Sequence, residues 1–99
     1  MGKLVRDRIP ELIRADGRTP SVRTLDADDY LAALLDKLVE EATELRAAPP
    51  AQRVEELADV HEVLAAILIH LDIDMSGVIA VADEKRADRG AFDDRIWLD

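Results

Sequence analysis

The stretch Lys37–Asp59, KLVEEATELRAAPPAQRVEELAD, decides the fold. At its centre stands the pair Pro49-Pro50, and a helix interior does not accommodate proline, because the ring removes a hydrogen-bond donor and clashes with the preceding turn. Proline is tolerated in the first turn of a helix. We therefore expect one helix to end near Ala47 or Ala48 and another to begin near Pro50, which gives a tight antiparallel hairpin.

Two groups of carboxylates flank the proline pair, residues 40–44 and 55–59. Each residue climbs about 1.5 Å along its helix, so positions at equal distances from the turn lie at one level of an antiparallel hairpin. In this register Glu41 is level with Asp59, and Glu44 is level with Glu56. The spacing predicts that these four carboxylates face each other across the hairpin.

Several negative charges held together need a cation between them, since buried charges are paired or bind metals. Mg²⁺ prefers oxygen ligands and keeps positions open for water and phosphate, so it fits an all-carboxylate site, with Mn²⁺ as a substitute. Acidic residues at this spacing are also common on solvated helix faces. Glu41, however, borders the apolar stripe of its helix, whereas Glu44 lies further round and Glu40 lies on the far side.

These motifs bear a family likeness. The EExxE of residues 40–44, followed after a short turn by the ExxD of residues 56–59, resembles the MazG-like nucleoside triphosphate pyrophosphohydrolases. The opening KLVRDRIPE of residues 3–11 and the closing residues 84–92 are similar to the short house-cleaning members, so the resemblance covers nearly the whole chain. It implies an all-α, MazG-like helical bundle over residues 1–99, with the metal site on the hairpin, and a homodimer or higher homo-oligomer.

The resemblance also implies roles for individual residues. Glu40 corresponds to the base that activates water, although it could equally be a solvated partner of Lys37. The implied metal ligands are Glu41, Glu44, Glu56 and Asp59, and the implied substrate-binding residues are Lys85, Arg89, Lys3, Arg6, Lys37 and Asp83. Simpler readings stand beside these: Lys85 and Arg89 also suit the negative end of a helix, Lys3 and Arg6 could be surface charge, and Asp83 could pair with Arg86.

The implied activity is Mg²⁺-dependent hydrolysis of a nucleoside triphosphate between its α and β phosphates, which releases a monophosphate and pyrophosphate. House-cleaning of non-standard nucleotides is the first expectation. A phosphoribosyl-ATP pyrophosphohydrolase of histidine biosynthesis comes second, because the serine-tyrosine-threonine stretch associated with those enzymes is not evident. A non-catalytic helical oligomer that senses nucleotides is the alternative from another class.

Composition narrows the range of partners. The 99 residues carry 22 acidic and 13 basic side chains, a formal net charge of −9, which argues against binding to nucleic-acid polymers. No cysteine is present, so no disulfide framework forms.

No secretory signal is visible, and the longest apolar run, Val63–Ile69, is far shorter than the roughly 20 residues that cross a bilayer. We expect a cytoplasmic protein with no membrane partner and one small domain.

The remaining elements are read from local signals. Residues 1–8 should be extended, because Pro10 disfavours helix at the residue before it, and a short helix should cover Glu11–Ala15. Residues 18–25 should form a loop or extended chain, and the tail from Phe92 should pack against the rest of the chain.

Three long helices are also expected. They should run from a cap at Asp26 or Asp28 to about Ala47, from about Pro50 to Leu71, and from a cap at Asp74 or Ser76 to about Arg89. Val63–Ile69 is apolar on all sides, which predicts that a partner subunit covers it.

Overall fold

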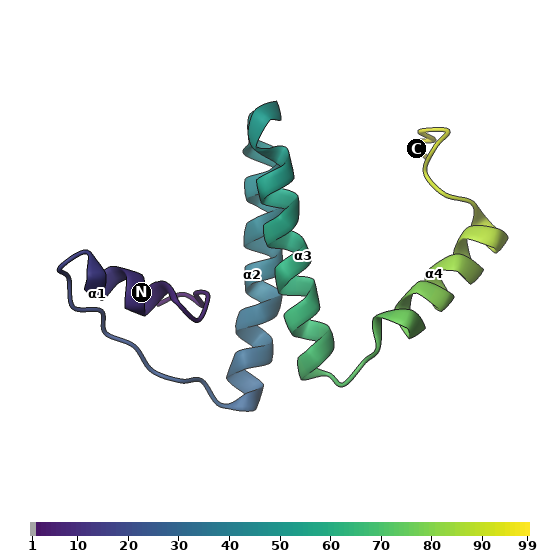
Figure 1. The fold of residues 1–99 in the computed structure, drawn as a ribbon. Coiled ribbons are helices and arrows are strands. Elements are labelled where there is room, and N and C mark those ends of the chain that lie inside the picture. The colour runs from purple at the N-terminus through teal and green to yellow at the C-terminus, as the bar shows by residue number, and fades with distance from the viewer. Residues whose placement is uncertain (1) are drawn as a thin grey trace. The chain divides into compact units, whose positions relative to one another are not determined.

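The computed structural model describes residues 2–99, and all regular secondary structure in this part of the chain is helical (Figure 1). This confirms the all-α prediction. Its helices are α1 (Ile9–Ala15), α2 (Ala27–Ala47), the short 3₁₀ helix η1 (Pro50–Gln52), α3 (Arg53–His70) and α4 (Met75–Arg89). The chain divides into two compact units, the first ending at Ile67 and the second running from Leu68 to Asp99. The division falls inside α3 rather than at a linker, and the expectation of one domain over residues 1–99 stays a prediction.

Helices α2 and α3 run side by side in opposite directions and form the predicted hairpin (Figure 1). Helix α2 ends at Ala47, because Ala48 and Pro49 both take extended backbone angles. Pro50 begins not an α-helix but one turn of 3₁₀ helix, and α3 follows from Arg53. The proline pair therefore ends one helix and starts the next, as its chemistry requires.

The start of α2 is fixed by a side-chain cap. The Asp26 carboxylate accepts a hydrogen bond of 2.8 Å from the backbone N–H of Asp29. This satisfies one of the four N–H groups that a helix leaves unpaired at its beginning. Of the two predicted caps, Asp26 is the one used, and Asp28 lies in the first turn.

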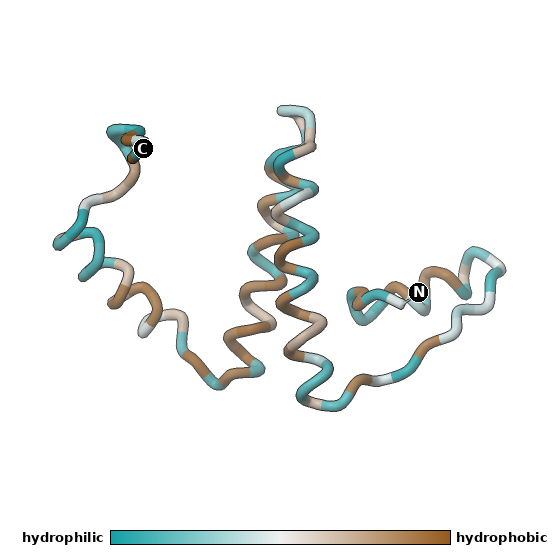
Figure 2. The backbone as a smooth tube through the Cα atoms, turned by 180° about the vertical axis from the view of Figure 1, so that it is seen from behind, coloured by the Kyte–Doolittle hydropathy of each residue, from teal (hydrophilic) through white to brown (hydrophobic). Residues whose placement is uncertain are grey.

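The core of the hairpin is small. Leu34 of α2 packs with Val63 and Ile67 of α3, and the partly buried Leu4, Tyr30, Leu38 and Ala66 surround this cluster. Hydrophobic and hydrophilic residues alternate along both helices (Figure 2), so each buries one face. Leu64 and Ile69 are exposed in the single chain, Ile69 to 81%, and the prediction that a partner subunit covers Val63–Ile69 stays a prediction. Within the hairpin, α3 buries Val63 and Ile67 against Leu34 of α2.

The N-terminal segment ends in α1, which begins at Ile9, two residues earlier than predicted. Pro10 lies in the first turn, where its missing N–H leaves no bond unmade. The backbone N–H of Ile9 donates to the carbonyl of Arg6, which starts the turn ahead of the proline. Gly17, at a φ of +85°, follows the end of the helix, and residues 18–26 form neither helix nor strand, as expected.

In the second unit, α4 matches the predicted helix. Its N-cap residue is Asp74, and its C-cap residue is Gly90. Gly90 has a φ of +80° and donates its N–H to the carbonyl of Arg86. The expectation that the tail packs down is wrong: Phe92 is 96% exposed and Trp97 is 84% exposed. Charged residues 93–95 separate these side chains, so the tail has no continuous apolar face.

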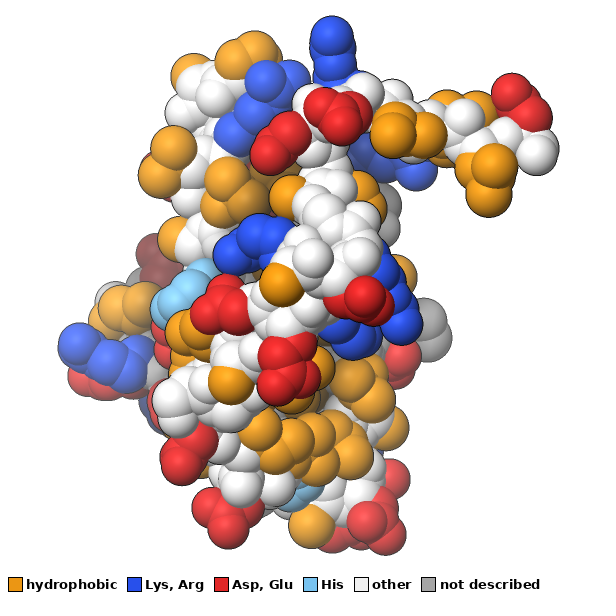
Figure 3. Space-filling view, turned by 90° about the vertical axis from the view of Figure 1, so that its right-hand side faces the viewer, with side chains coloured by type: hydrophobic (Ala, Val, Ile, Leu, Met, Phe, Trp, Pro, Cys, Tyr) orange, Lys and Arg blue, Asp and Glu red, His pale blue; other side chains and the backbone are white. Residues whose placement is uncertain are grey.

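The described surface mixes apolar and charged side chains (Figure 3). No single helix among residues 2–99 combines the length and hydropathy needed to cross a membrane. One pair of helical stretches reaches that threshold by length and composition only when the two are taken together, Pro50–His70 and Met75–Arg89.

Candidate metal centre

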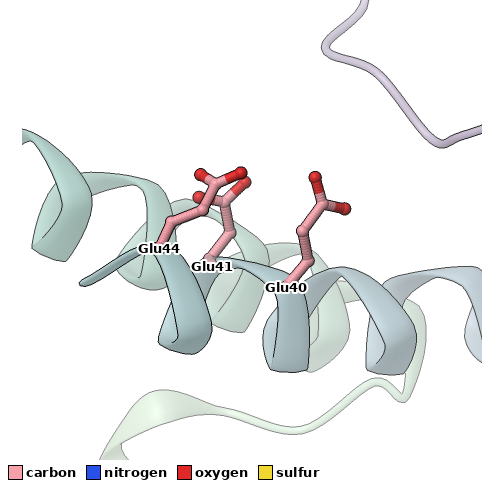
Figure 4. Close-up of side chains that lie close together, drawn as sticks. All are labelled: Glu40, Glu41 and Glu44. Atoms are coloured by element: carbon pink, nitrogen blue, oxygen red, sulfur yellow. The ribbon is translucent and has the colours of Figure 1, made fainter. Parts of the chain in front are cut away.

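Glu41 is the point at which two groups of carboxylates meet. Oxygens of Glu41, Glu56 and Asp59 lie within 4.8 Å of one another, and so do oxygens of Glu40, Glu41 and Glu44. The first group joins α2 to α3 across the hairpin. The second lies along α2 alone, where the three side chains project together and those of Glu41 and Glu44 are close (Figure 4).

The predicted register is visible in this arrangement, with one difference. Glu41 and Asp59 are neighbours, as their equal distances from the turn predict. Within the described chain, however, Glu44 groups with Glu40 and Glu41 rather than with Glu56 and Asp59. Glu44 is exposed. It follows Glu41 by three residues, and three steps of 100° leave it 60° from Glu41 around the helix axis, on the side away from α3.

Glu41 is buried, at 5% exposed, and it is the one charged residue of the described chain in that class. Its Oε1 atom lies 3.4 Å from Nζ of Lys37. Its Oε2 atom is buried and has no hydrogen-bond partner among the described residues, and the same is true of Oε2 of Glu56. A buried carboxylate oxygen without a partner is unusual, because the desolvation of a charged group is expensive.

Burial raises the pKa of the Glu41 carboxyl above its ordinary value of 4.5. The neighbouring Glu44 acts in the same direction, because a second acid beside it disfavours the charged form, and Lys37 opposes both. Glu44 can act as a hydrogen-bond partner of Glu41 only when one of the two carries a proton. This cluster of carboxylates thus contains one, that of Glu41, which resists ionisation.

Lys37 lies between two acids. Its Nζ atom is 3.6 Å from Oε1 of Glu40 and 3.4 Å from Oε1 of Glu41, and its side chain is mostly buried. Sequence reasoning placed Glu40 on the far side of the helix, but the structure brings it to the cluster, since a glutamate side chain is long and Lys37 attracts both acids. Lys37, expected among the substrate-binding residues, pairs with these carboxylates in the structure.

Arg6 reaches the centre from the N-terminal segment. Its Nη2 atom donates to Oδ1 of Asp59 at 2.8 Å. Sequence reasoning placed Arg6 with the phosphate-binding residues and missed this contact. Lys3, on the same segment, is exposed.

The other predicted substrate-binding residues lie on α4, in the second unit. Asp83 forms the ion pair with Arg86 that was its simpler reading, at 3.2 Å. Arg89 lies 3.9 Å from the Asp88 carboxylate. Lys85 lines a shallow, largely apolar hollow together with Ile73, Gly77, Val78, Val81 and Ala82.

Comparison with known proteins adds one relative. An uncharacterized protein of Mycolicibacterium smegmatis is 71% identical over 48 residues, which are 48% of this chain and 49% of that protein. The similarity thus covers about half the length of each. No family model matches the chain, and no solved structure matches it. Membership of the MazG-like group therefore stays a prediction from the motifs.

Proposed function

We propose that the protein is a Mg²⁺-dependent nucleoside triphosphate pyrophosphohydrolase of the MazG-like kind. The observation that supports this most directly is Glu41, whose buried and unpartnered oxygen lies where two carboxylate groups meet. An acid in that position is costly for a protein that only has to fold, and a bound cation would offset the cost.

The donor set fits Mg²⁺. Glu41, Glu56 and Asp59 offer carboxylate oxygens from two helices, and two of these residues carry buried oxygens that lack partners in the described chain. Mg²⁺ typically takes one or two carboxylates and retains positions for water and phosphate, and Mn²⁺ accepts the same donors. Zn²⁺ is disfavoured, because the chain has no cysteine and neither described group contains a histidine.

Glu41, Glu56 and Asp59 would hold the metal, with Glu44 at the exposed side of Glu41. A metal bound there would neutralise phosphate charge and acidify water. Glu40 is half-buried beside the cluster and suits the role of general base, taking a proton from the attacking water. Lys37, whose Nζ atom lies 3.6 Å from Oε1 of Glu40, would hold this carboxylate beside the cluster.

The proposed substrate is a nucleoside triphosphate, cut by water between the α and β phosphates to give a monophosphate and pyrophosphate. Lys3, Arg6, Lys85 and Arg89 are the cations proposed to bind its phosphates, which suits a chain whose net charge otherwise repels anions. House-cleaning of non-standard nucleotides in the cytoplasm is the proposed role, and phosphoribosyl-ATP is the alternative substrate.

The proposal includes assembly into at least a dimer. Apolar side chains of the hairpin, Leu35 and Val39 on α2 and Leu57 and Leu64 on α3, are exposed in the single chain. Small domains often cover such residues by association. Light scattering at micromolar concentration tests this, and a clean monomer would contradict it.

The experiment that tests the activity is pyrophosphate release from a panel of standard, deaminated and oxidised nucleoside triphosphates and phosphoribosyl-ATP, with Mg²⁺ and then with chelator. Glu41→Gln should abolish release. Glu62→Gln, an exposed acid on α3, is the matched control and should leave it unchanged. Metal-dependent release would support the proposal, and the best substrate would identify the role. Absence of release from every compound by a protein that still binds Mg²⁺ would favour a sensing module instead.

A further inference from the structure

The N-terminal segment contacts the hairpin at two neighbouring points. Leu4 packs against the core cluster of Leu34, Val63 and Ile67, and Arg6 donates to Asp59 at 2.8 Å. In an extended chain, residues two apart point to the same side, so one face of the segment makes both contacts. Residues 2–6 have no helix or strand of their own, and their position therefore depends on these contacts.

The Arg6 contact uses a carboxylate that the proposed metal site also needs. Asp59 belongs to the group with Glu41 and Glu56, and its Oδ1 atom is already bound to the guanidinium. A divalent cation on the other oxygen of Asp59 would lie within a carboxylate's width of the guanidinium, and the two cations would repel. Simultaneous binding of Arg6 and a metal ion to Asp59 therefore costs free energy, because the two cations repel each other.

We propose that Arg6 is an internal competitor for the metal site: it neutralises Asp59 while the site is empty, and metal binding displaces it. This inference rests on the metal site of the proposed function. It also connects the observed Arg6–Asp59 contact with the proposed phosphate-binding role of Arg6, because Arg6 can bind the phosphates of a nucleotide only after it leaves Asp59. Metal binding releases the guanidinium at the point where a phosphate would arrive, and Leu4 keeps the segment nearby.

The size of the effect follows from the exposure of the pair. More than half of the Arg6 side chain and two fifths of the Asp59 side chain are exposed. Exposed ion pairs contribute at most about 1 kcal/mol, which corresponds to about a fivefold change in an equilibrium constant. Removal of Arg6 should therefore tighten Mg²⁺ binding by about two- to fivefold.

The test is isothermal titration calorimetry of the full chain with MgCl₂, and with MnCl₂ as a second probe, without nucleotide. Arg6→Gln should bind more tightly than wild type, and Arg6→Lys, which keeps the charge, should lie between them. Arg8→Gln is the matched control: it removes the same charge two residues away, from a side chain that is 79% exposed and pairs with Glu11. Its affinity should equal that of the wild type.

A second measurement follows Arg6 directly. The side-chain Nε–Hε resonance of Arg6, observed by ¹H–¹⁵N NMR, should move toward that of a free arginine as Mg²⁺ is added, while the Arg8 resonance stays in place. Equal Mg²⁺ affinities in wild type and Arg6→Gln with an unmoved resonance, or weaker binding by Arg6→Gln, would overturn the competition and leave the metal site intact. If neither ion binds wild type or any variant, the metal site fails as well.

Discussion

Replacement of Glu41 by glutamine should stabilise the metal-free protein. The substitution keeps the shape of the side chain and removes a charge that is buried and lacks a partner for one oxygen. A buried, unsatisfied polar group costs about 1–3 kcal/mol. The loss of the contact with Lys37 subtracts about 0.5 kcal/mol, the usual worth of such a pair on a helix. Lys37 is not left unpaired, because Glu40 remains 3.6 Å away.

The net gain near neutral pH is therefore about 0.5–2.5 kcal/mol, and each kcal/mol raises the Tm of a chain of this size by about 4–8 °C. The gain should depend on pH. The pKa of Glu41 is raised in the folded state, so between its ordinary value of 4.5 and the raised value the folded chain binds more protons than the unfolded chain. The wild type thus loses stability as pH rises through this window, and Glu41→Gln lacks that loss.

Urea unfolding at about pH 4.5, where the window begins, and at about pH 7.5, both in chelator, measures both effects, and the advantage of Glu41→Gln should be larger at the higher pH. Added Mg²⁺ should reverse the order, because it stabilises only a chain that binds it, by about 2.7 kcal/mol at a hundred times its Kd. Glu62→Gln should behave as wild type throughout. A Glu41→Gln protein that is less stable than wild type near neutral pH without metal, or whose advantage is the same at both pH values, would refute this reasoning.

Three further predictions concern the base, the core and the cap. Glu40→Gln should lower kcat by about a hundredfold or more while Mg²⁺ binding, measured by calorimetry, persists, since a general base acts on the proton and not on the metal. Leu34→Ala should cost at least about 2 kcal/mol in urea unfolding, because Leu34 is 3% exposed, whereas Val22→Ala, in the segment before α2 and 57% exposed, should cost less than about 1 kcal/mol. Asp26→Ala should cost about 1 kcal/mol by the same measurement, and Asp26→Asn, which can still accept the bond from Asp29, a few tenths.

The parts of the fold that follow local chemistry could be predicted from the sequence. The proline pair ended α2 and began the next turn, Asp26 capped α2, and Gly90 closed α4, because each signal acts within one helical turn of itself. The register across the hairpin was also predictable. Once the turn is placed, the level of Glu41 relative to Asp59 follows from the helical rise.

Contacts between distant segments could not be read in this way. Arg6 and Asp59 are 53 residues apart, and the segment that carries Arg6 has no periodicity to say which face it presents. Glu40 was misplaced for a different reason: the helical wheel locates a Cβ atom, and a glutamate carboxylate reaches well beyond it, here toward Lys37. The tail was misjudged because its aromatic residues suggested burial, while the charges between them prevent a common apolar face.

The charge balance around Glu41 shows at which acids a bound cation would recover the most free energy. Two cations, Lys37 and Arg6, face five carboxylates, those of Glu40, Glu41, Glu44, Glu56 and Asp59, so the cluster keeps an excess of negative charge. Glu44 is exposed and relieves its share of the repulsion through water, which screens exposed charges well. Glu41 and Glu56 each have a buried oxygen that lacks a hydrogen-bond partner among the described residues. The free energy that a bound cation recovers is therefore greatest at those two residues, and Glu44→Gln should change metal-free stability far less than Glu41→Gln.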